Sequence, residues 1–286
     1  MTKTAFLFSG QGAQKLGMAR DLYDQYETVK ATFDEASQAL GYDLRALIDN
    51  DEEKLNETKY TQPAILTTSV AILRLLSENG IKPDLVAGLS LGEYSALVAS
   101  GIIDFQEAVK LVAKRGQYMT EAAPTGSGKM VAVMNTDPAL IEEICQKAAE
   151  FKGGIVSPAN YNTPAQIVIG GEVEAVDYAV ELLKEAGVRK LIELKVSGPF
   201  HTAILKPASE KLALELDKID FRPFELPLIS NTSAKVMEND EVKGLLTRQV
   251  MEPVRFYESV ETMQKLGATR CLLYTSDAAD DLLCVD

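Results

Sequence analysis

The sequence predicts a mixed α/β protein in which a smaller domain is inserted into a larger one. Short apolar runs, typical of buried strands, alternate with longer segments whose apolar residues recur at helical spacing. The stretch 125–196 has its own order of strands and helices, with glycines at 126 and 128 near its start and Gly198-Pro199 after its end. We therefore expect a large domain formed by residues 1–124 and 197–270 and an inserted domain formed by residues 125–196.

Turn and cap residues locate the elements of the large domain. Gly41 interrupts the first helical region, and Pro63, tolerated in a first turn, predicts the start of a long helix. Asp104 followed by Glu107 resembles a capping box and predicts another helix start. The predicted elements are a strand at 4–8, helices within 16–60, a helix at 64–78, a strand at 85–87, helices at 91–100 and 104–123, a helix ending at 216, a strand at 226–230, a helix ending at 249 and a helix from 253 to 266.

The inserted domain is predicted to have the order strand, helix, strand, strand, helix, strand. Its predicted elements are a strand at 130–134, a helix at 138–150, strands at 155–161 and 166–170, a helix at 173–186 and a strand at 188–196. This order is that of the ferredoxin-like split motif.

Ser90 lies in the pattern G-x-S-x-G, between an apolar strand and a helical segment. This context is that of a nucleophile elbow. A sharp turn from strand to helix crowds its flanking positions, so Gly88 and Gly92 need to lack side chains. The alternative interpretation is a glycine-rich turn with a helix-capping serine, and the pattern alone leaves it open.

Gln11 lies in a second glycine-containing loop, directly after the first strand. Lys15 stands where a dinucleotide-binding loop has its third glycine, which disfavours that interpretation. Sites built on a nucleophile elbow take one oxyanion-binding N–H from the residue after the nucleophile and another from a loop after an earlier strand. Leu91 and Gln11 would provide these two N–H groups.

His201 is the only histidine, so it is the only candidate for an imidazole base. Its predicted position is a loop at the domain junction, where functional residues are common. Arg115 lies on the apolar stripe of the helix at 104–123, where a guanidinium needs an anionic partner. Two interpretations stay open: a snorkelling or structurally paired arginine, and a clamp for a substrate carboxylate.

Composition argues against several functional classes. The net charge of −13 disfavours nonspecific nucleic-acid binding and binding to an anionic membrane surface. We expect no membrane span, no signal peptide and a cytoplasmic location, since long uncharged apolar runs are missing and three cysteines lie far apart. One histidine and scattered cysteines predict no metal site.

Several motifs in order resemble the malonyl-CoA:acyl carrier protein transacylase family of bacterial type II fatty acid synthesis, over about residues 3–270. They are 10–14 (GQGAQ), 61–64 (TQPA), 88–96 (GLSLGEYSA), 114–116 (KRG), 160–166 (NYNTPAQ), 198–201 (GPFH), Gln249 and 253–256 (PVRF). The resemblance implies an α/β-hydrolase-like large domain with a ferredoxin-like insert, and a site between the two.

The resemblance also implies a role for each matched residue. Ser90 is the nucleophile and His201 the base, the N–H groups of Gln11 and Leu91 bind the oxyanion, and Arg115 binds the malonyl carboxylate. The backbone carbonyl of Gln249 orients His201. Phe200, Asn160 and Asn162 are the further implied substrate-binding residues.

The implied reaction is ping-pong transfer of malonyl from malonyl-CoA to the phosphopantetheine thiol of acyl carrier protein, with no metal or redox cofactor. We expect a monomer, and a local cationic patch that docks the acidic carrier. A serine esterase or thioesterase, a non-catalytic carrier-binding scaffold and a malonyltransferase of polyketide assembly are the alternatives.

Two departures from the family pattern concern Leu89 and the C-terminal tail. Leu89 replaces a histidine common in relatives, at a position outside the mechanism. From Arg270 onward we expect none of the family's final strand, Gly-Pro-Gly turn and helix. The hypothesis is that residues 271–286 replace the natural C-terminus, as a frameshift would, and intact-mass measurement of the natively expressed protein would test it.

Overall fold

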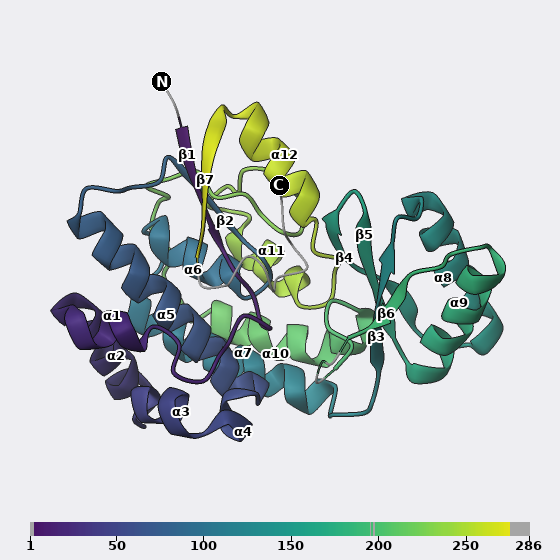
Figure 1. Cartoon of the computed structure of the whole chain (residues 1–286), viewed down its shortest axis with the longest axis horizontal. Coiled ribbons are helices and arrows are strands. Elements are labelled where there is room, and N and C mark those ends of the chain that lie inside the picture. Colours follow the sequence, from purple (N-terminus) through teal and green to yellow (C-terminus); the bar gives the residue numbers. More distant parts are fainter. Residues whose placement is uncertain (1–2, 195, 197, 275–286) are drawn as a thin grey trace.

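The computed structural model describes residues 3–194, 196 and 198–274, and within these ranges it is a mixed α/β structure with two sheets. Figure 1 shows helices α1 to α7 gathered beside the first sheet, with the second sheet and helices α8 and α9 at the opposite end of the molecule. None of the helices in these ranges combines the length and apolarity needed to cross a bilayer.

The first sheet has three parallel strands in the order β2-β1-β7. They are β1 (Lys3–Phe8), β2 (Leu85–Gly88) and β7 (Ala268–Tyr274). Alternate residues of β1 point to opposite faces: Phe6 and Phe8 pack with the main helical core, while Ala5 and Leu7 pack in a separate cluster with residues of α12. Strand β2 and most of β1 are therefore buried on both faces, as parallel strands usually are, whereas most described residues of β7 are exposed.

Strand β7 corrects the prediction for the tail, because it continues through Tyr274 and pairs along β1. The predicted replaced tail was expected to contain no strand from Arg270 onward. Residues 275–286, with the rest of that prediction and Cys284, lie outside the described residues.

The helices around the first sheet follow the predicted order with altered bounds. They are α1 (Arg20–Gln25), α2 (Glu27–Leu40), α3 (Leu44–Asn50), α4 (Glu52–Leu55), α5 (Thr58–Glu78), α6 (Gly92–Ala99), α7 (Phe105–Ala122), a 3₁₀ turn η1 (Ala203–Leu205), α10 (Lys206–Leu216), α11 (Val242–Gln249) and α12 (Phe256–Lys265). The predicted helix start at Pro63 was wrong, because α5 begins at Thr58 and Pro63 lies inside it. The strand predicted at 226–230 is reduced to isolated bridges that pair Leu228 with Val86 and Ile229 with Val236.

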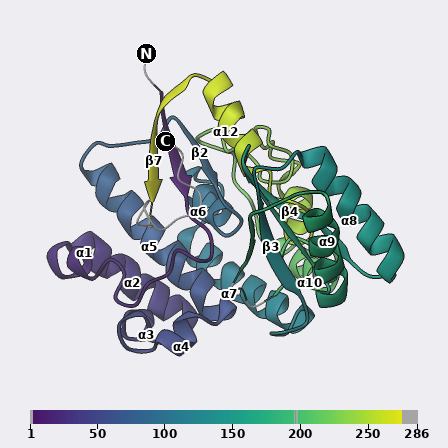
Figure 2. The same cartoon turned by 45° about the vertical axis from the view of Figure 1, so that its right-hand side comes forward.

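The second sheet is antiparallel, in the order β4-β5-β3-β6, and is built from the predicted sequence of elements. These are β3 (Lys129–Met134), α8 (Pro138–Lys152), β4 (Val156–Thr163), β5 (Gln166–Gly171), α9 (Val173–Glu185) and β6 (Leu191–Glu193). Figures 1 and 2 show α8 and α9 covering one face of this sheet. Val131 and Val133 pack on that face, whereas Met130 and Ala132 join the main core on the other.

Backbone hydrogen bonds connect strand β4 of the second sheet to the segment before α12. The N–H of Val254 donates to the carbonyl of Ala159 at 2.9 Å, and the N–H of Tyr161 donates to the carbonyl of Val254 at 2.8 Å. Val254 is fully buried. Strand β4 is thus fixed to the part of the chain that follows α11 and Gln249.

Candidate active site

Ser90 lies at the carboxyl end of β2, directly before α6, in a backbone conformation that few L-residues adopt. Its φ is +52°, and its side chain is half-buried. A Cβ at Gly88 would clash with the backbone of Gly92, and one at Gly92 would clash with the Phe8 carbonyl. Both glycines are therefore required by crowding, as predicted for an elbow.

The second side chain at this point is the single histidine. His201 is 4% exposed, and its Nε2 lies 2.8 Å from Ser90 Oγ. Its Nδ1 lies 2.7 Å from the backbone carbonyl of Gln249, an acceptor, so Nδ1 bears the proton and Nε2 is free to accept one from Ser90. Burial and, secondly, the charge of Arg115 lower the pKa of His201 to about 4, so the imidazole is neutral at pH 7.

Arg115 reaches the same hydroxyl from α7. It is 1% exposed, and its Nη2 donates to Ser90 Oγ at 3.1 Å and to Gln249 Oε1 at 2.9 Å, while Nη1 donates to Gln62 Oε1 at 2.9 Å. Within the described ranges no carboxylate forms an ion pair with Arg115, and its Nε has no hydrogen-bond partner. Its guanidinium lies 5.2 Å from the ring centroid of Tyr94, and burial lowers its pKa.

These contacts argue against the first interpretation of Arg115, and its role as a clamp stays a prediction. A structurally paired arginine would contact a carboxylate, and a snorkelling one would reach solvent. Arg115 does neither within the described structure, since neutral oxygens surround its charge. A free anionic group that bound beside Ser90 would supply the direct carboxylate contact that Arg115 lacks.

The backbone N–H groups of Leu91 and Gln11 are those predicted to bind an oxyanion. Leu91 is fully buried at the start of α6, and its N–H has no acceptor among the residues that the structure describes. The N–H of Gln11 likewise donates to no described residue. The Gln11 side chain donates to Thr58 Oγ1 at 3.1 Å, which fixes this loop on the first turn of α5.

The remaining predicted substrate-binding residues are less closely connected to Ser90. Phe200 is 9% exposed and precedes His201. Asn162 donates from Nδ2 to Gln166 Oε1 at 2.8 Å, and its Oδ1 is buried without a partner. Asn160 pairs with Val168 in the second sheet. Neither asparagine hydrogen bonds to Ser90, His201 or Arg115 in the described part of the chain, so their role stays a prediction.

Sequence reasoning missed three buried polar residues that hold the elbow. Asn231 Oδ1 accepts from the N–H of Ser90 at 2.6 Å, and its Nδ2 donates to the carbonyl of Gly88 at 2.5 Å. Glu93 is fully buried and accepts hydrogen bonds from the backbone N–H of Asn231 and from the side chain of Gln249. Gln62 accepts a hydrogen bond from Arg115. Gln62 and Glu93 lay within motifs already noted, but a motif does not say which of its side chains point inward.

Burial raises the pKa of Glu93 to about 7, although its hydrogen bonds and the charge of Arg115 act in the opposite direction. Both Glu93 oxygens face N–H donors, which favours the ionised form.

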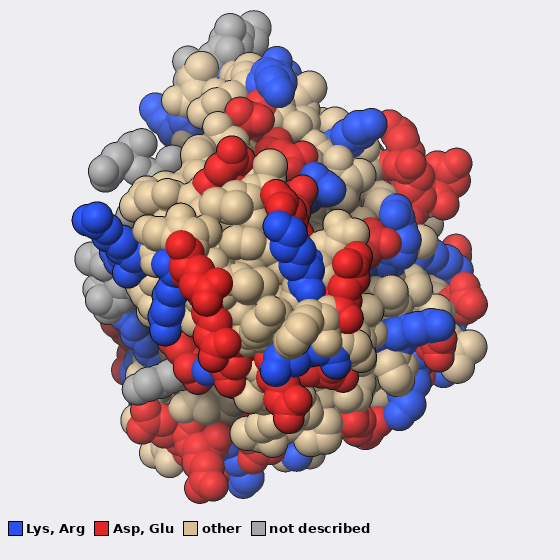
Figure 3. All heavy atoms as spheres, turned by 90° about the vertical axis from the view of Figure 1, so that its right-hand side faces the viewer, with Lys and Arg blue, Asp and Glu red and all other residues tan. Residues whose placement is uncertain are grey.

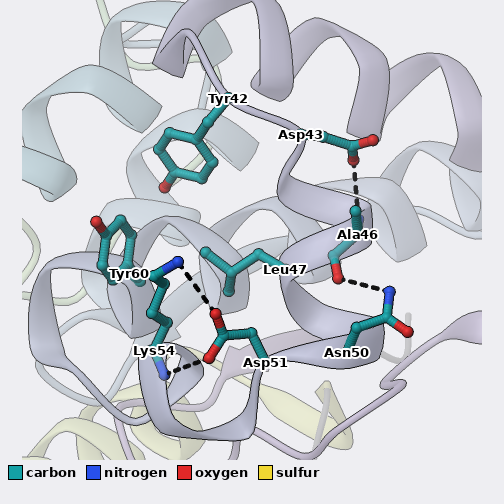
Figure 4. A pocket seen from close by; sticks show the side chains of 8 residues that line it. All are labelled: Tyr42, Asp43, Ala46, Leu47, Asn50, Asp51, Lys54 and Tyr60. Carbon is teal, nitrogen blue, oxygen red and sulfur yellow. Dashed lines mark hydrogen bonds and ion pairs between the residues drawn. The ribbon is translucent and has the colours of Figure 1, made fainter.

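A separate cavity of about 460 Å³ lies between α3, α4 and α5 (Figure 4), and none of the predicted site residues lines it. Tyr42, Leu47, Lys54 and Tyr60 are among its lining residues, and Asp51 there accepts from the N–H of Lys54. No group of three His, Cys, Asp or Glu side chains suited to a metal ion occurs within the described ranges.

Comparison with known proteins gives one consistent result. The model of the acyl transferase domain family matches residues 5–269. Malonyl CoA-acyl carrier protein transacylase of Bacillus subtilis is 47% identical over 271 residues, covering 94% of this chain and 85% of that protein. The Escherichia coli K12 protein of the same name is 48% identical over 270 residues, covering 93% and 87%.

Solved structures agree. The MCAT crystal structure from Streptococcus pneumoniae has a TM-score of 0.93 and 67% identity, covering 95% of this chain and 88% of that one. A malonyl-transacylase solved in complex with its type II PKS acyl-carrier protein has a TM-score of 0.93 and 44% identity, covering 96% and 89%.

Proposed function

The chain belongs to the acyl transferase domain family and, within it, to the malonyl-CoA:acyl carrier protein transacylases, and from this we propose how it transfers the malonyl group from malonyl-CoA to acyl carrier protein. One observation supports the substrate above all others. A buried guanidinium without a carboxylate partner donates directly to the hydroxyl of the nucleophile. An acyl group that bears its own carboxylate fits this site, because bidentate arginine–carboxylate pairs are strong and directional.

The first half-reaction forms a malonyl ester on Ser90. Nε2 of His201 takes the proton of Ser90 Oγ as this oxygen attacks the thioester carbonyl, and Nδ1–H stays bonded to the Gln249 carbonyl. The N–H groups of Gln11 and Leu91 bind the oxyanion. Loss of one such donor costs about 3–4 kcal/mol in comparable enzymes. The C–S bond then breaks, and His201 returns the proton to the CoA sulfur.

The second half-reaction reverses the roles. His201 takes the proton of the carrier's phosphopantetheine thiol, the sulfur attacks the malonyl ester, and Ser90 leaves with the proton. Arg115 holds the malonyl carboxylate through both halves. A neutral imidazole at pH 7 suits the base role in each half, because it can accept a proton without first losing one.

Competing functions are not favoured by the relatives. A serine esterase or thioesterase shares the elbow but gains nothing from a buried arginine beside the nucleophile. A non-catalytic scaffold would need neither the strained Ser90 nor an aligned histidine.

We also propose the finer architecture that the family implies. The parallel order β2-β1-β7, with Ser90 after β2, supports an α/β-hydrolase-like catalytic domain. The antiparallel order β4-β5-β3-β6, with α8 and α9 on one face, supports a ferredoxin-like insert. Phe200, Asn160 and Asn162 remain proposed substrate contacts. The protein acts as a monomer in the cytoplasm, where the free thiols of Cys145 and Cys271 would stay reduced.

The docking surface for the carrier is proposed at the α8–α9 side of the molecule, where positive and negative side chains are interspersed (Figure 3). Lys147 pairs with Glu143, so it offers little charge to a partner. Three exposed cations near β6 have no ion pair among the described residues, and these are Lys184, Arg189 and Lys190.

The experiment that tests the function is incubation with malonyl-CoA followed by mass spectrometry of the intact protein and its peptides. We expect a malonyl adduct on Ser90 that disappears when holo acyl carrier protein is added, and none on Ser90→Ala. Release of the adduct into water at the same rate without carrier would instead indicate a thioesterase.

A further inference from the structure

Glu93 is a buried carboxylate that the mechanism above does not use. It lies three residues after Ser90 on α6 and is fully buried. Its Oε1 accepts from the backbone N–H of Asn231 at 2.8 Å, and its Oε2 accepts from Gln249 Nε2 at 2.5 Å. No lysine or arginine forms an ion pair with it within the described ranges. A buried carboxylate without an ion-pair partner lowers the stability of the fold, so we expect that it serves a function in the site.

Glu93 determines which way the Gln249 amide points. An ionised carboxylate only accepts hydrogen bonds, so the amide NH₂ must face Glu93. The same NH₂ donates to the carbonyl of Ser90 at 2.8 Å. Its Oε1 is thereby left facing Arg115, which only donates, at 2.9 Å. The flipped amide would set oxygen against oxygen and NH₂ against the guanidinium.

Gln249 therefore separates a buried negative charge from a buried positive one. Glu93 compensates the charge of Arg115 through one neutral amide, without forming an ion pair with it. A carboxylate in direct contact with Arg115 would occupy the donors that an incoming acyl carboxylate needs. With the amide between them, the guanidinium keeps its attraction for an anion beside Ser90.

We propose that Glu93 is a positioning residue for acyl-group selectivity: through Gln249 it orients Arg115 and keeps the guanidinium available to a carboxylate-bearing acyl group. The proposal rests on the proposed malonyl transfer and adds a residue that touches neither the acyl group nor the reacting atoms. Its effect should appear as discrimination between malonyl and acetyl groups, because only malonyl needs Arg115.

The test compares Glu93→Gln with Glu181→Gln, which removes the same charge from an exposed position on α9. Acylation of Ser90 is measured with malonyl-CoA and with acetyl-CoA. We expect E93Q to lower kcat/KM for malonyl-CoA by about 10- to 100-fold, mostly through KM, because a charge-assisted hydrogen bond is lost. The acetyl-CoA value should change much less, and E181Q should match the wild type for both.

A folded E93Q with unchanged kinetics, or with equal losses for both thioesters, would overturn the proposal. The second variant, Glu93→Gln with Gln249→Glu, keeps an amide–carboxylate pair but moves the charge next to Arg115. It should lose malonyl transfer at least as strongly as E93Q while it still accepts acetyl. Wild-type malonyl kinetics in this double variant would likewise show that Glu93 has no role in selectivity.

Failure of the proposed function would look different, because it concerns the wild type alone. A wild-type protein that forms no malonyl adduct contradicts malonyl transfer, whatever the variants do. A wild-type protein that forms the adduct, with variants that do not discriminate, contradicts only the role of Glu93.

Discussion

At the scale of single residues, Arg115 and His201 affect each other because both hydrogen bond to Ser90 Oγ. The hydroxyl accepts from the guanidinium and donates to the imidazole. The charge of Arg115 is also the second cause of the lowered pKa of His201. The residue proposed to bind the substrate carboxylate therefore also helps to keep the base neutral.

Arg115→Ala should separate these contributions. We expect kcat/KM for malonyl-CoA to fall by at least about 100-fold, because a buried partner of the acyl carboxylate is removed. Acceptance of acetyl-CoA should persist. Both are measured as acyl-enzyme formation in a single turnover, with Arg20→Ala, an exposed arginine paired to Asp24 and Asp49, as the control. Equal losses with both thioesters would contradict the clamp.

The pH dependence of acylation should report His201 directly. Its pKa of about 4 lies below the ordinary 6.5, so the neutral, proton-accepting form persists as the pH falls toward 4. With acetyl-CoA as the probe, whose transfer does not depend on the charge of Glu93, we expect kcat/KM to be flat from pH 8 to about 5 and to decline only below that. Circular dichroism at each pH would exclude unfolding, and a half-maximal rate near pH 6.5 would contradict the prediction.

With acetyl-CoA as the probe, the same variant, Arg115→Ala, should begin to lose activity at a higher pH than the wild type. The reason is that one of the two causes of the low pKa of His201 is removed. Burial of His201 remains, so the pH of half-maximal activity should stay below that expected for an exposed histidine. An unchanged pH of half-maximal activity would show that the charge of Arg115 does not lower the pKa of His201.

The sequence could predict those site residues whose function is indicated by a local motif or by a unique residue type. Ser90 and His201 were predictable because an elbow motif and a unique imidazole are both local facts. Arg115 was predictable as a buried arginine, but its partners were not, because Gln62 and Gln249 come from helices far away in the chain. Asn231 was not predictable, since its contacts with the elbow span 141 residues.

At the scale of elements, the turn from β2 to α6 depends on contacts that only glycine permits. Gly92 lies against the carbonyl of Phe8 in β1, so the helix start and the neighbouring strand share the space a side chain would fill. The same close approach brings the N-terminus of α6 beside the loop of Gln11.

Gly92→Ala should destabilise the fold and slow acylation, whereas Gly244→Ala should not. A Cβ at Gly244 meets nothing within 4 Å, and this glycine lies inside α11, so alanine there should add about 0.5–1 kcal/mol of stability. Gly92→Ala should lower the free energy of unfolding by about 1–3 kcal/mol or more. Urea unfolding of both variants checks this, and a Gly92→Ala variant as stable as the wild type would refute the crowding argument.

The elements that sequence patterns predicted poorly are those whose hydrogen-bond partners lie far away in the sequence. Strand β7 pairs with β1, which lies more than 260 residues earlier in the chain. The residues 268–274 alone do not indicate that they would pair with this strand. The apolar run at 226–230 looked like a strand, but its residues form only isolated bridges. The βαββαβ order was easier to predict, because its paired strands are closer together in the sequence than β1 and β7 are.

At the scale of the whole molecule, the proposed mechanism uses only side chains and backbone groups of this chain. Ser90, His201 and Arg115 converge on one oxygen, and backbone N–H groups of Gln11 and Leu91 lie at the same end of the parallel strands. The backbone bonds between β4 and Val254 fix the segment that follows Gln249.

Metal removal should therefore leave transfer unchanged. Dialysis against EDTA, followed by assay in metal-free buffer with malonyl-CoA and holo carrier protein, should give the untreated rate. A loss of rate that added divalent metal restores would contradict the proposed absence of a metal cofactor.

The lone, enclosed imidazole has a practical consequence. Because the chain has one histidine and no tryptophan, the native untagged protein would give a single pair of imidazole ring signals in a proton NMR spectrum. Those nuclei lie between Ser90 and the Gln249 carbonyl, so each acylation, release or change in Gln249 would shift them. The protein thus contains its own site-specific spectroscopic label, and turnover could be followed without attaching any other.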